Sequence, residues 1–475
     1  MVSVLLRFDR GTLCIEGYPD AATLPGVLWD PRACAFRAPA HAAPSIVAEL
    51  RDRGLEVDRL PWPASRLDEP DEPGEPGEPG ERVWLPPTLR PYQQSALDAW
   101  LAFDRRGVVV VPTGGGKTRI ALAAMALTRA PTAVLCPTRA LLEQWRGEIA
   151  KVYRAPVGVV GDGERRVEAL TVMTFESAYR QMDALGDRFA LLVVDEAHHF
   201  ASGARSEALE TTTAPFRLGL TATAPAPPRR DGERGHLEAL VGRVVSEVSL
   251  ESLLGTHLAD LDMVRVSVAL TRREREEYLR LSEPLLALAR VFRRTNPHGD
   301  WAALVAALSE SDAGRAALRA FRRATDLCSL PEAKLTTTLR LIERHAHQGD
   351  KVLIFTQSVD DAYRIGHEAL APVLSAETSR EERDHLLAGF RAGALRVLVS
   401  ARVLNEGLDV PDARVAILAG GSLGTRELVQ RVGRVLRAAP GKRAVVYELT
   451  TADTIEERRA ARRRAHLVAA FPALG

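Results

Sequence analysis

The sequence predicts an α/β protein with two doubly wound parallel-sheet domains in tandem, a small α+β N-terminal domain and a helical insertion between the two sheets. Three observations predict this organisation. The length of 475 residues suits about three domains. Apolar runs of strand length alternate with helical segments in two stretches, one after residue 85 and one over residues 351–450. Between these stretches, residues 271–330 have an almost wholly helical pattern.

The composition excludes several classes of protein. Hydrophobic residues make up 46% of the chain, which is enough for packed cores, and no apolar run approaches the length of a membrane span. The first residues lack the basic stretch and apolar region of a secretion signal, so we expect a soluble cytoplasmic protein. The formal net charge is +1, so any nucleic-acid surface must be local. No C-x-x-C pair occurs among the cysteines, which argues against a zinc site, an iron–sulfur cluster or a disulfide framework; they are Cys14, Cys34, Cys136 and Cys328.

Residues 1–65 are predicted to form the small α+β domain. The alternating runs SVLLRF and TLCIEG predict strands, and APSIVAELRDRGLEV predicts an amphipathic helix. The next segment, DEPDEPGEPGEPGER at residues 68–82, is acidic, rich in proline and glycine, and without apolar side chains. Because it cannot bury a core, residues 66–84 are assigned to an extended linker.

The first parallel sheet is assigned to residues 85–255. Its buried strands are predicted at the apolar runs GVVVVPTG, TAVLCPT, LTVMTF, LLVVDEA and FRLGLTAT, and its covering helices at TRIALAAMALTRA and RALLEQWRGEIAKVY. Residues 256–330 form a connecting segment with the helical insertion. The second sheet is assigned to residues 331–475, with strands at KVLIFTQS, RVLVSA, VAILAG and AVVYELT.

A phosphate-binding loop is predicted at VVPTGGGKT, residues 110–118, which follows a strand and opens a helix. Lys117 is expected to reach the β- and γ-phosphates of a nucleotide, and Thr118 to ligate Mg²⁺. The strict pattern has glycine where this chain has Val111. The remaining residues expected to bind the nucleotide here are Thr113, Gly114, Gly115 and Gly116.

The run LLVVDEAHH, residues 191–199, places two carboxylates at the end of another strand. Because the carboxyl ends of parallel strands meet at one edge of the sheet, these side chains should face the phosphate loop. Asp195 is expected to hold Mg²⁺ and Glu196 to polarise the attacking water. His198 either couples the ATP site to other parts of the protein or is an ordinary core histidine.

An arginine cluster occurs in LVQRVGRVLR, residues 428–437. On a helix, Arg431, Arg434 and Arg437 share one face and repel each other unless an anion lies between them. Arg434 and Arg437 are therefore candidates for an arginine finger that reaches a γ-phosphate from the second domain. A solvated basic helix is the alternative, since lysine is rare and arginine abundant throughout this chain.

Together these motifs resemble those of the superfamily 2 helicases. The matching stretches are LRPYQQSAL, PTRALLEQW, DEAH, TAT, VLNEGLDVP and QRVGRVLR. More specifically, APFRLGLTAT, ETSREER and the small N-terminal domain are similar to the XPB family of DNA helicases. The resemblance implies two RecA-like domains, a damage-recognition-like N-terminal domain and a thumb-like insertion that grips DNA. It also implies ATP and Mg²⁺ as cofactors and 3′→5′ movement in a DNA-repair setting.

The resemblance carries roles over residue by residue. Gln93 is expected to read the adenine edge, with Arg90 and Tyr92 beside it. The other residues expected near the nucleotide are Gly407, Asp409 and Gln430. Coupling between the two activities is expected at His198, Thr221 and Thr223. Contacts with the nucleic-acid backbone are expected at Pro137, Thr138, Arg139, Thr174, Phe175, Thr378, Ser379 and Arg380.

The family's Arg-Glu-Asp loop aligns with Arg229, Arg230 and Asp231, which puts strand separation in more doubt than ATP hydrolysis. Three alternatives to a DNA helicase stay open: a duplex translocase that does not separate strands, an ATP-switched module that binds damaged DNA, and an RNA helicase. A nuclease is poorly supported, because no second carboxylate cluster has metal-ligand spacing. The expected partners are single-stranded or forked DNA and a separate nuclease or repair protein, and no membrane. A monomer suffices for a complete ATP site, and the expected location is the nucleoid.

Overall fold

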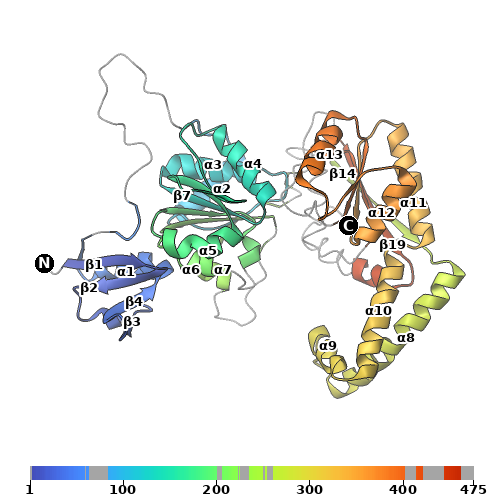
Figure 1. Ribbon diagram of the computed structural model, residues 1–475, viewed down its shortest axis with the longest axis horizontal. Helices are drawn as coiled ribbons and strands as arrows, with labels where there is room; N and C mark the ends of the chain where they lie inside the picture. The colour runs from blue at the N-terminus through green and yellow to red at the C-terminus, as the bar shows by residue number, and fades with distance from the viewer. Residues whose placement is uncertain are drawn as a thin grey trace, which may run out of the picture. The chain divides into compact units, whose positions relative to one another are not determined.

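The computed structural model describes residues 3–58, 60–63, 84–200, 206–222, 224, 235–249, 252–253, 260–401, 413–420 and 443–461. The described residues fall into two compact units, one up to residue 249 and the other from residue 252 onward (Figure 1). Both units are α/β, as the sequence predicts. No helix among the described residues is long and apolar enough to cross a membrane.

The first unit begins with a small α+β domain. Its sheet has the strand order β3-β4-β2-β1-β5, in which β1 pairs with β2 antiparallel and with β5 parallel. One helix, α1, buries Ile46 and Leu50 in the same core as Leu6 and Leu13 from the sheet. The bounds are β1 Ser3–Asp9, β2 Thr12–Glu16, β3 Leu28–Asp30, β4 Ala35–Pro39, α1 Ala43–Asp52 and β5 Glu56–Val57. Short 3-10 turns lie at η1 Ala21–Thr23 and η2 Ala40–Ala42.

The larger sheet of the first unit has the order β13-β6-β12-β11-β7-β10-β8-β9, and all its neighbouring strands are parallel except the pair β8 and β9. Its strands are β6 Arg106–Val110, β7 Thr132–Cys136, β8 Gly158–Gly161, β9 Glu164–Arg166, β10 Leu170–Thr174, β11 Leu191–Val194, β12 Phe216–Thr221 and β13 Val244–Glu247. Five of them coincide with the apolar runs that predicted buried strands. These runs have no polar face because helices cover both sides of the sheet.

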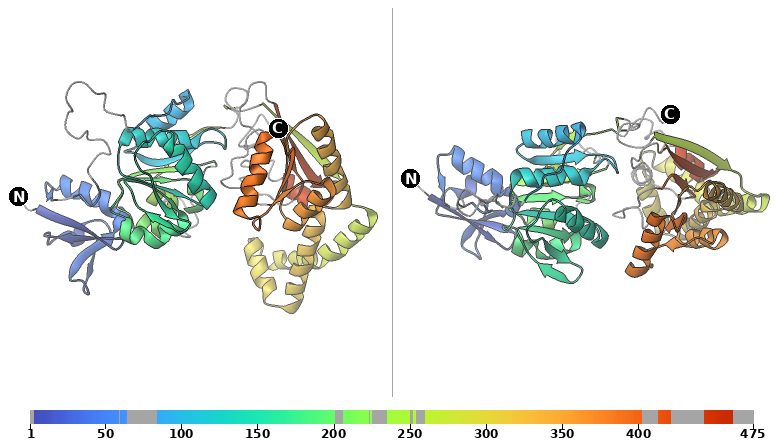
Figure 2. Two further views of the ribbon diagram at one scale, coloured as in Figure 1. Left: turned by 45° about the horizontal axis from the view of Figure 1, so that its top comes forward. Right: turned by 90° about the horizontal axis from the view of Figure 1, so that it is seen from above.

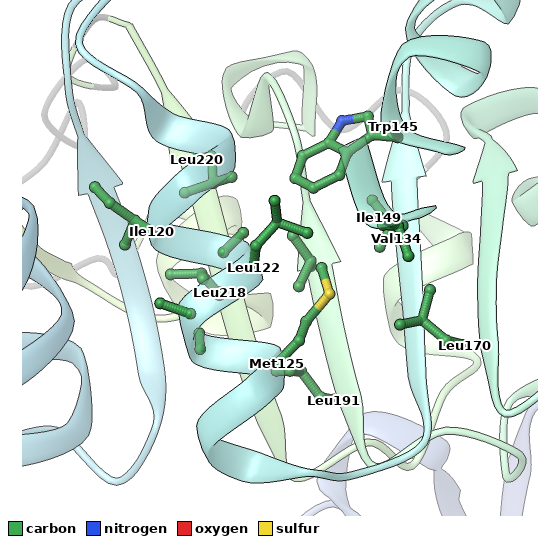
Figure 3. Close-up of a cluster of buried hydrophobic side chains, with 14 of the residues drawn as sticks. Ile120, Leu122, Met125, Val134, Trp145, Ile149, Leu170, Leu191, Leu218 and Leu220 are labelled. Carbon is green, nitrogen blue, oxygen red and sulfur yellow. The ribbon is translucent and has the colours of Figure 1, made fainter. Parts of the chain in front are cut away.

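Two separate hydrophobic clusters fill the two faces of this sheet. One cluster packs the helices α2 Pro91–Ala102, α3 Lys117–Thr128 and α4 Arg139–Ala150 against the strands (Figure 3). The other packs α5 Phe175–Leu185, the 3-10 turn η3 Ala197–Phe200, α6 Glu207–Glu210 and α7 His236–Leu240 (Figure 1). The sheet is therefore doubly wound, and its carboxyl edge carries the loops that contain the predicted motifs.

The small domain and the larger sheet are joined by specific contacts within the first unit. The Thr213 hydroxyl donates a hydrogen bond of 2.6 Å to the carbonyl oxygen of Pro61. The ring of Trp62 packs against the cores of both domains. Trp84 lies within the core of the larger sheet and packs against Tyr153, with the ring centroids 4.5 Å apart. Trp62 and Trp84, on either side of the acidic run at residues 68–82, thus serve as packing anchors.

The second unit contains an all-parallel sheet of order β14-β19-β18-β15-β17-β16. Its strands are β14 Asp260–Val268, β15 Val352–Thr356, β16 Val373–Leu374, β17 Val397–Ala401, β18 Val415–Leu418 and β19 Arg443–Thr451. The helices α11 Glu332–His347, α12 Val359–Ala369 and α13 Arg380–Ala392 accompany it. The edge strand β14 lies in the stretch assigned by sequence to the connecting segment, and local pattern did not predict that it joins the second sheet.

The helical insertion consists of α8 Arg272–Thr295, α9 Trp301–Ser309 and α10 Asp312–Ser329. The long helices α8 and α10 lie side by side and extend away from the sheet (Figures 1 and 2). A buried ion pair lies where these helices join the sheet, and in it Lys334 Nζ is 2.6 Å from Glu456 Oε2. Lys334 also donates to the carbonyl oxygen of Cys328 near the end of α10. The insertion is thereby attached to the sheet of its own unit.

Candidate nucleotide site and nucleic-acid cleft

The phosphate loop connects β6 to α3 at the carboxyl edge of the larger sheet. Gly114 and Gly116 have φ of 88° and 81°, in the left-handed region that favours glycine. A Cβ atom at Gly116 would lie 2.4 Å from Gln93 Nε2, so a side chain there would displace the Gln93 amide. Helix α3 begins at Lys117, so its free N–H groups and the positive end of its dipole face the loop. The loop can therefore hold phosphate.

The residues expected to read adenine contact this loop. Gln93 is almost fully buried, and its Nε2 donates to the carbonyl oxygen of Gly115 at 2.9 Å. The Tyr92 hydroxyl donates a hydrogen bond of 2.7 Å to the same oxygen. The backbone N–H of Arg90 donates to Gln93 Oε1 at 2.9 Å, which fixes the amide orientation at the start of α2. The structure thus brings Arg90, Tyr92 and Gln93 together with the phosphate loop.

The two acidic residues of DEAH follow β11 and lie in different surroundings. Asp195 Oδ1 accepts the backbone N–H of Glu196, and Asp195 Oδ2 accepts the indole N–H of Trp145, both at 2.9 Å. Burial, with a further contribution from Glu196, raises the pKa of Asp195 to about 6. Glu196 Oε1 lies 3.2 Å from Lys117 Nζ. Burial alone would raise the pKa of Glu196, but Lys117 and His198 oppose it and the pKa is lowered.

Glu196 also adopts an unusual backbone conformation. Its φ is 48°, in the left-handed region that costs a residue with a Cβ atom about 1–3 kcal/mol. Its Oε2 atom is buried without a hydrogen-bond partner, and His198 Nδ1 lies 3.4 Å from it. The backbone of Glu196 is therefore strained, and its Oε2 atom is available to accept a proton from a bound water.

The donor set at Asp195 and Thr118 fits Mg²⁺. Carboxylate and hydroxyl oxygens are the hard ligands that Mg²⁺ prefers, and each Asp195 oxygen uses only one acceptor position for its protein hydrogen bond. No group of three His, Cys, Asp or Glu residues suited to a metal occurs in the described parts of the chain. Such an ion would therefore depend on nucleotide phosphates and water for its remaining ligands, as Mg²⁺ commonly does.

His198 connects two strands at this edge. Its Nδ1 atom lies 3.2 Å from the hydroxyl of Thr221, at the end of β12. In the sheet order, β12 lies between β6 and β11, so Thr221 stands between the phosphate loop and the DEAH residues. His198 is 7% exposed, which agrees with both interpretations of this residue. Thr223 lies outside the described residues.

A cleft of about 690 Å³ lies at the same edge, past β7 and β10. Pro137, Thr138, Arg139 and Thr174 all line it, together with the turn between β8 and β9. Thr138 accepts the N–H of Leu141 and so begins α4, while Thr174 begins α5 by accepting the N–H of Ser177. Arg139 Nη1 is paired with Asp162 Oδ1 of the turn at 2.6 Å.

Phe175 differs from the other residues expected at the nucleic-acid backbone. Its side chain is 5% exposed and packs against Phe200, with ring centroids 4.6 Å apart. The ring belongs to the core beneath α5, because the period of that helix turns it inward. Only the backbone of Phe175 is left for the predicted contact.

In the second unit, Thr378 and Ser379 have local structural roles. Thr378 Oγ1 accepts the N–H of Ser375 at 2.9 Å, and Ser379 begins α13 by accepting the N–H of Glu382. Arg380 is the first residue of α13. The other positions predicted in the second RecA-like domain lie outside the described residues: Gly407, Asp409, Gln430, Arg431, Arg434 and Arg437. The same holds for Arg229, Arg230 and Asp231 of the first unit.

Comparisons with known proteins agree with this architecture. Residues 87–226 match the model of the type III restriction enzyme res subunit, and residues 333–439 match the helicase conserved C-terminal domain. Residues 6–58 match the damage recognition domain of the xeroderma pigmentosum group B helicase. The crystal structure of the Pyrococcus furiosus Hef helicase domain resembles this chain with a TM-score of 0.50 and 20% sequence identity. The alignment covers 79% of this chain and 98% of that one.

A phosphate loop and a DEAH sequence on the first of two tandem RecA-like domains define a helicase of superfamily 2. A "DNA 3'-5' translocase XPB2" from Sulfurisphaera tokodaii is 32% identical over 97% of this chain and 100% of its own length. A "DNA 3'-5' helicase XPB" from Kineococcus radiotolerans is 30% identical over 80% of this chain and 62% of its own length. This chain belongs to the XPB family, which confirms the resemblance found in the sequence.

Proposed function

We propose that this chain is an ATP-dependent DNA helicase or translocase that moves 3′→5′ along DNA in DNA repair. The observation that carries the proposal is the group of Lys117, Asp195 and Glu196 at the carboxyl edge of the first sheet. The cleft of Thr138, Arg139 and Thr174 opens at the same edge. Relatives over most of the chain bear names that state action on DNA.

The ion pair of Lys117 and Glu196 suggests how ATP prepares its own hydrolysis. A bound γ-phosphate attracts the Lys117 ammonium away from Glu196, because the phosphate carries more negative charge. Glu196 is then free to accept a proton from the attacking water. The water oxygen bonds to the γ-phosphorus while the bond from that phosphorus to the bridging oxygen breaks, which gives ADP and inorganic phosphate. Thr118 and Asp195 would hold Mg²⁺, which neutralises phosphate charge when bound.

The resemblance to superfamily 2 helicases assigns further roles in ATP hydrolysis to residues of the second RecA-like domain. Arg434 and Arg437 would stabilise the charge on the transferred phosphoryl group. Gly407, Asp409 and Gln430 would contact the nucleotide. Because both domains are in one chain, a monomer suffices. For DNA, Thr378, Ser379 and Arg380 would contact the nucleic-acid backbone.

Steady-state ATP hydrolysis tests the proposal directly. The wild type and Arg437→Ala would each be measured without nucleic acid and with single-stranded DNA, duplex DNA or RNA. We expect DNA to stimulate the wild type, and Arg437→Ala to bind ATP but to lose turnover. Lys117→Ala, which removes the phosphate contact, should be inactive under every condition. Equal activity with and without DNA, or stronger stimulation by RNA, would contradict the proposed substrate.

A duplex translocase that does not separate strands is the second candidate. It is favoured by Arg230 at the position where the family's loop has glutamate, and by the translocase name of the Sulfurisphaera relative. Displacement of a third strand from a triplex without unwinding of a fork would support this candidate. Release of a single strand from a 3′-tailed duplex would support the helicase instead.

The match of residues 6–58 to a damage recognition domain supports a third candidate, a module that binds damaged DNA under control of ATP. Slow hydrolysis combined with lesion-selective binding would favour it. A separate nuclease or repair protein would then be the natural partner. For each candidate the substrate is DNA, so we propose a cytoplasmic, nucleoid-associated location.

A further inference from the structure

Trp145 occupies a special position in the core of the first RecA-like domain. Its side chain is 1% exposed and lies at one end of the hydrophobic cluster under α3 and α4. Figure 3 shows its indole nitrogen on the side of the ring away from Leu122 and Met125. That nitrogen donates to Asp195 Oδ2 at 2.9 Å. A core side chain therefore contacts the carboxylate proposed to hold Mg²⁺.

The indole N–H is suited to orient this carboxylate without competing for the metal. It is only a donor, carries no charge and cannot ligate an ion. It occupies one acceptor position of Oδ2, while the N–H of Glu196 occupies one position of Oδ1. The two bonds fix the plane of the carboxylate and leave the other lone pairs available. Partners of this kind typically change metal affinity 10- to 100-fold when they are removed.

The same helix reaches the proposed DNA cleft. Helix α4 begins directly after Thr138, with Arg139 as its first residue, and Trp145 follows seven residues after Thr138. Seven residues are two turns, or about 10 Å of a rigid helix. A DNA phosphate bound at the start of α4 would thus contact the same helix whose Trp145 side chain donates to Asp195.

We propose that Trp145 is a positioning residue that orients Asp195 for Mg²⁺ and links this carboxylate to the nucleic-acid cleft through α4. The first part concerns the nucleotide site alone. The second part, the link to DNA, rests on the proposed function.

The chain offers a matched control for the test. Trp100 is also fully buried in the same cluster, but its indole N–H donates to the backbone carbonyl oxygen of Arg217 at 3.0 Å. Trp145→Phe and Trp100→Phe each remove a buried indole and one hydrogen bond, so both should lower the midpoint of thermal unfolding by similar amounts. Only Trp145→Phe removes a bond to a proposed metal ligand.

The first measurement is binding of a fluorescent ADP analogue to the full chain, titrated with Mg²⁺ in the absence of DNA. We expect Trp145→Phe to weaken the apparent Mg²⁺ affinity about 10-fold or more. ADP affinity without Mg²⁺ should stay unchanged in both variants, and Trp100→Phe should retain the wild-type Mg²⁺ affinity. Equal Mg²⁺ affinity in the two variants would overturn the positioning role.

A second measurement does not depend on how well Trp145→Phe folds. With ¹⁵N-labelled tryptophan in otherwise unlabelled protein, one indole N–H resonance should shift when Mg²⁺ is added to the ADP-bound wild type. Asp195→Asn should move the same resonance in the nucleotide-free protein, because it changes the acceptor of that N–H. If no indole resonance responds to either change, the proposal is wrong.

The link to DNA is tested by the ratio of ATP turnover with and without DNA. Trp145→Phe should reduce this ratio, and Trp100→Phe should preserve it. A reduced Mg²⁺ affinity with an unchanged ratio would retain the positioning role and overturn the link. If DNA fails to stimulate the wild type, the proposed function fails, whereas the ADP and Mg²⁺ measurements still decide the role of Trp145.

Discussion

Each unit of the molecule contains a lysine–glutamate pair, buried in the second unit and partly buried in the first, and the two pairs differ in how many of their polar atoms have hydrogen-bond partners. In the second unit, Lys334 and Glu456 are 0% and 7% exposed, and Glu456 Oε2 also accepts the N–H of Thr451. In the first unit, Lys117 and Glu196 are 12% and 14% exposed, and Glu196 Oε2 has no hydrogen-bond partner.

The comparison distinguishes a structural ion pair from a reactive one. The Lys334 pair joins the base of the helical insertion to its sheet, and both of its side chains also hydrogen-bond to the protein backbone. The Lys117 pair lies beside a phosphate loop and is longer, at 3.2 Å against 2.6 Å. Buried polar groups without partners are costly, so an unsatisfied one indicates a site that a ligand or water completes.

The largest expected effect is on turnover in the first unit. Glu196→Gln keeps the shape of the side chain but removes its ability to accept a proton, so we expect turnover to fall about 10²- to 10⁴-fold. ATP binding, measured by equilibrium titration, should be retained, because Lys117 and the loop are intact. Glu143→Gln, on the exposed face of α4, is the charge control. Normal turnover by Glu196→Gln would remove it from the proposed mechanism.

In the second unit, the matching substitution should affect stability instead. Glu456→Gln leaves the Lys334 ammonium buried without a counter-charge, which we expect to cost about 3–5 kcal/mol in the free energy of unfolding. Chemical denaturation of the full chain measures this. Glu457→Gln removes a neighbouring carboxylate that accepts the N–H of Asp453 at an exposed position, so it should change stability by much less. Nucleotide affinity should be unchanged in both variants.

Whether the sequence could predict a feature of these sites depends on how far apart the residues involved lie in the chain. The phosphate loop and DEAH are local patterns, and the apolar runs predicted five strands of the first sheet because burial on both faces leaves a continuous signal. The contact of Trp145 with Asp195 spans 50 residues and that of Lys334 with Glu456 spans 122. Neither contact leaves a local pattern in the sequence. For the same reason, the sequence did not predict that β14 joins the second sheet.

Family resemblance supplied positions but not side-chain directions. It placed Phe175 among the nucleic-acid contacts, whereas the period of α5 turns its ring into the core. The arginine finger at Arg434 and Arg437 lies outside the described residues and stays a prediction.

A double replacement tests how the Lys334–Glu456 pair stabilises the second unit. Lys334→Met with Glu456→Leu exchanges the ion pair for apolar side chains of similar volume, which in buried sites is often neutral or stabilising. We therefore expect it to recover most of the stability lost in Glu456→Gln, as measured by the same denaturation experiment. If the double variant is as unstable as the single one, the hydrogen bonds to Cys328 and Thr451 matter more than the charge pair.

The smallest expected effect concerns an exposed pair, Arg139 and Asp162, whose side chains are 73% and 28% exposed. Asp162→Asn should change the free energy of unfolding by no more than about 1 kcal/mol, because solvent screens such pairs. It should nevertheless tighten binding of single-stranded DNA a few-fold, since a backbone phosphate no longer competes with Asp162 for Arg139. Fluorescence anisotropy at several salt concentrations measures this, with the exposed Asp183→Asn on α5 as the charge control. Equal tightening by both variants would mean that general charge, and not Arg139, governs DNA affinity at this cleft.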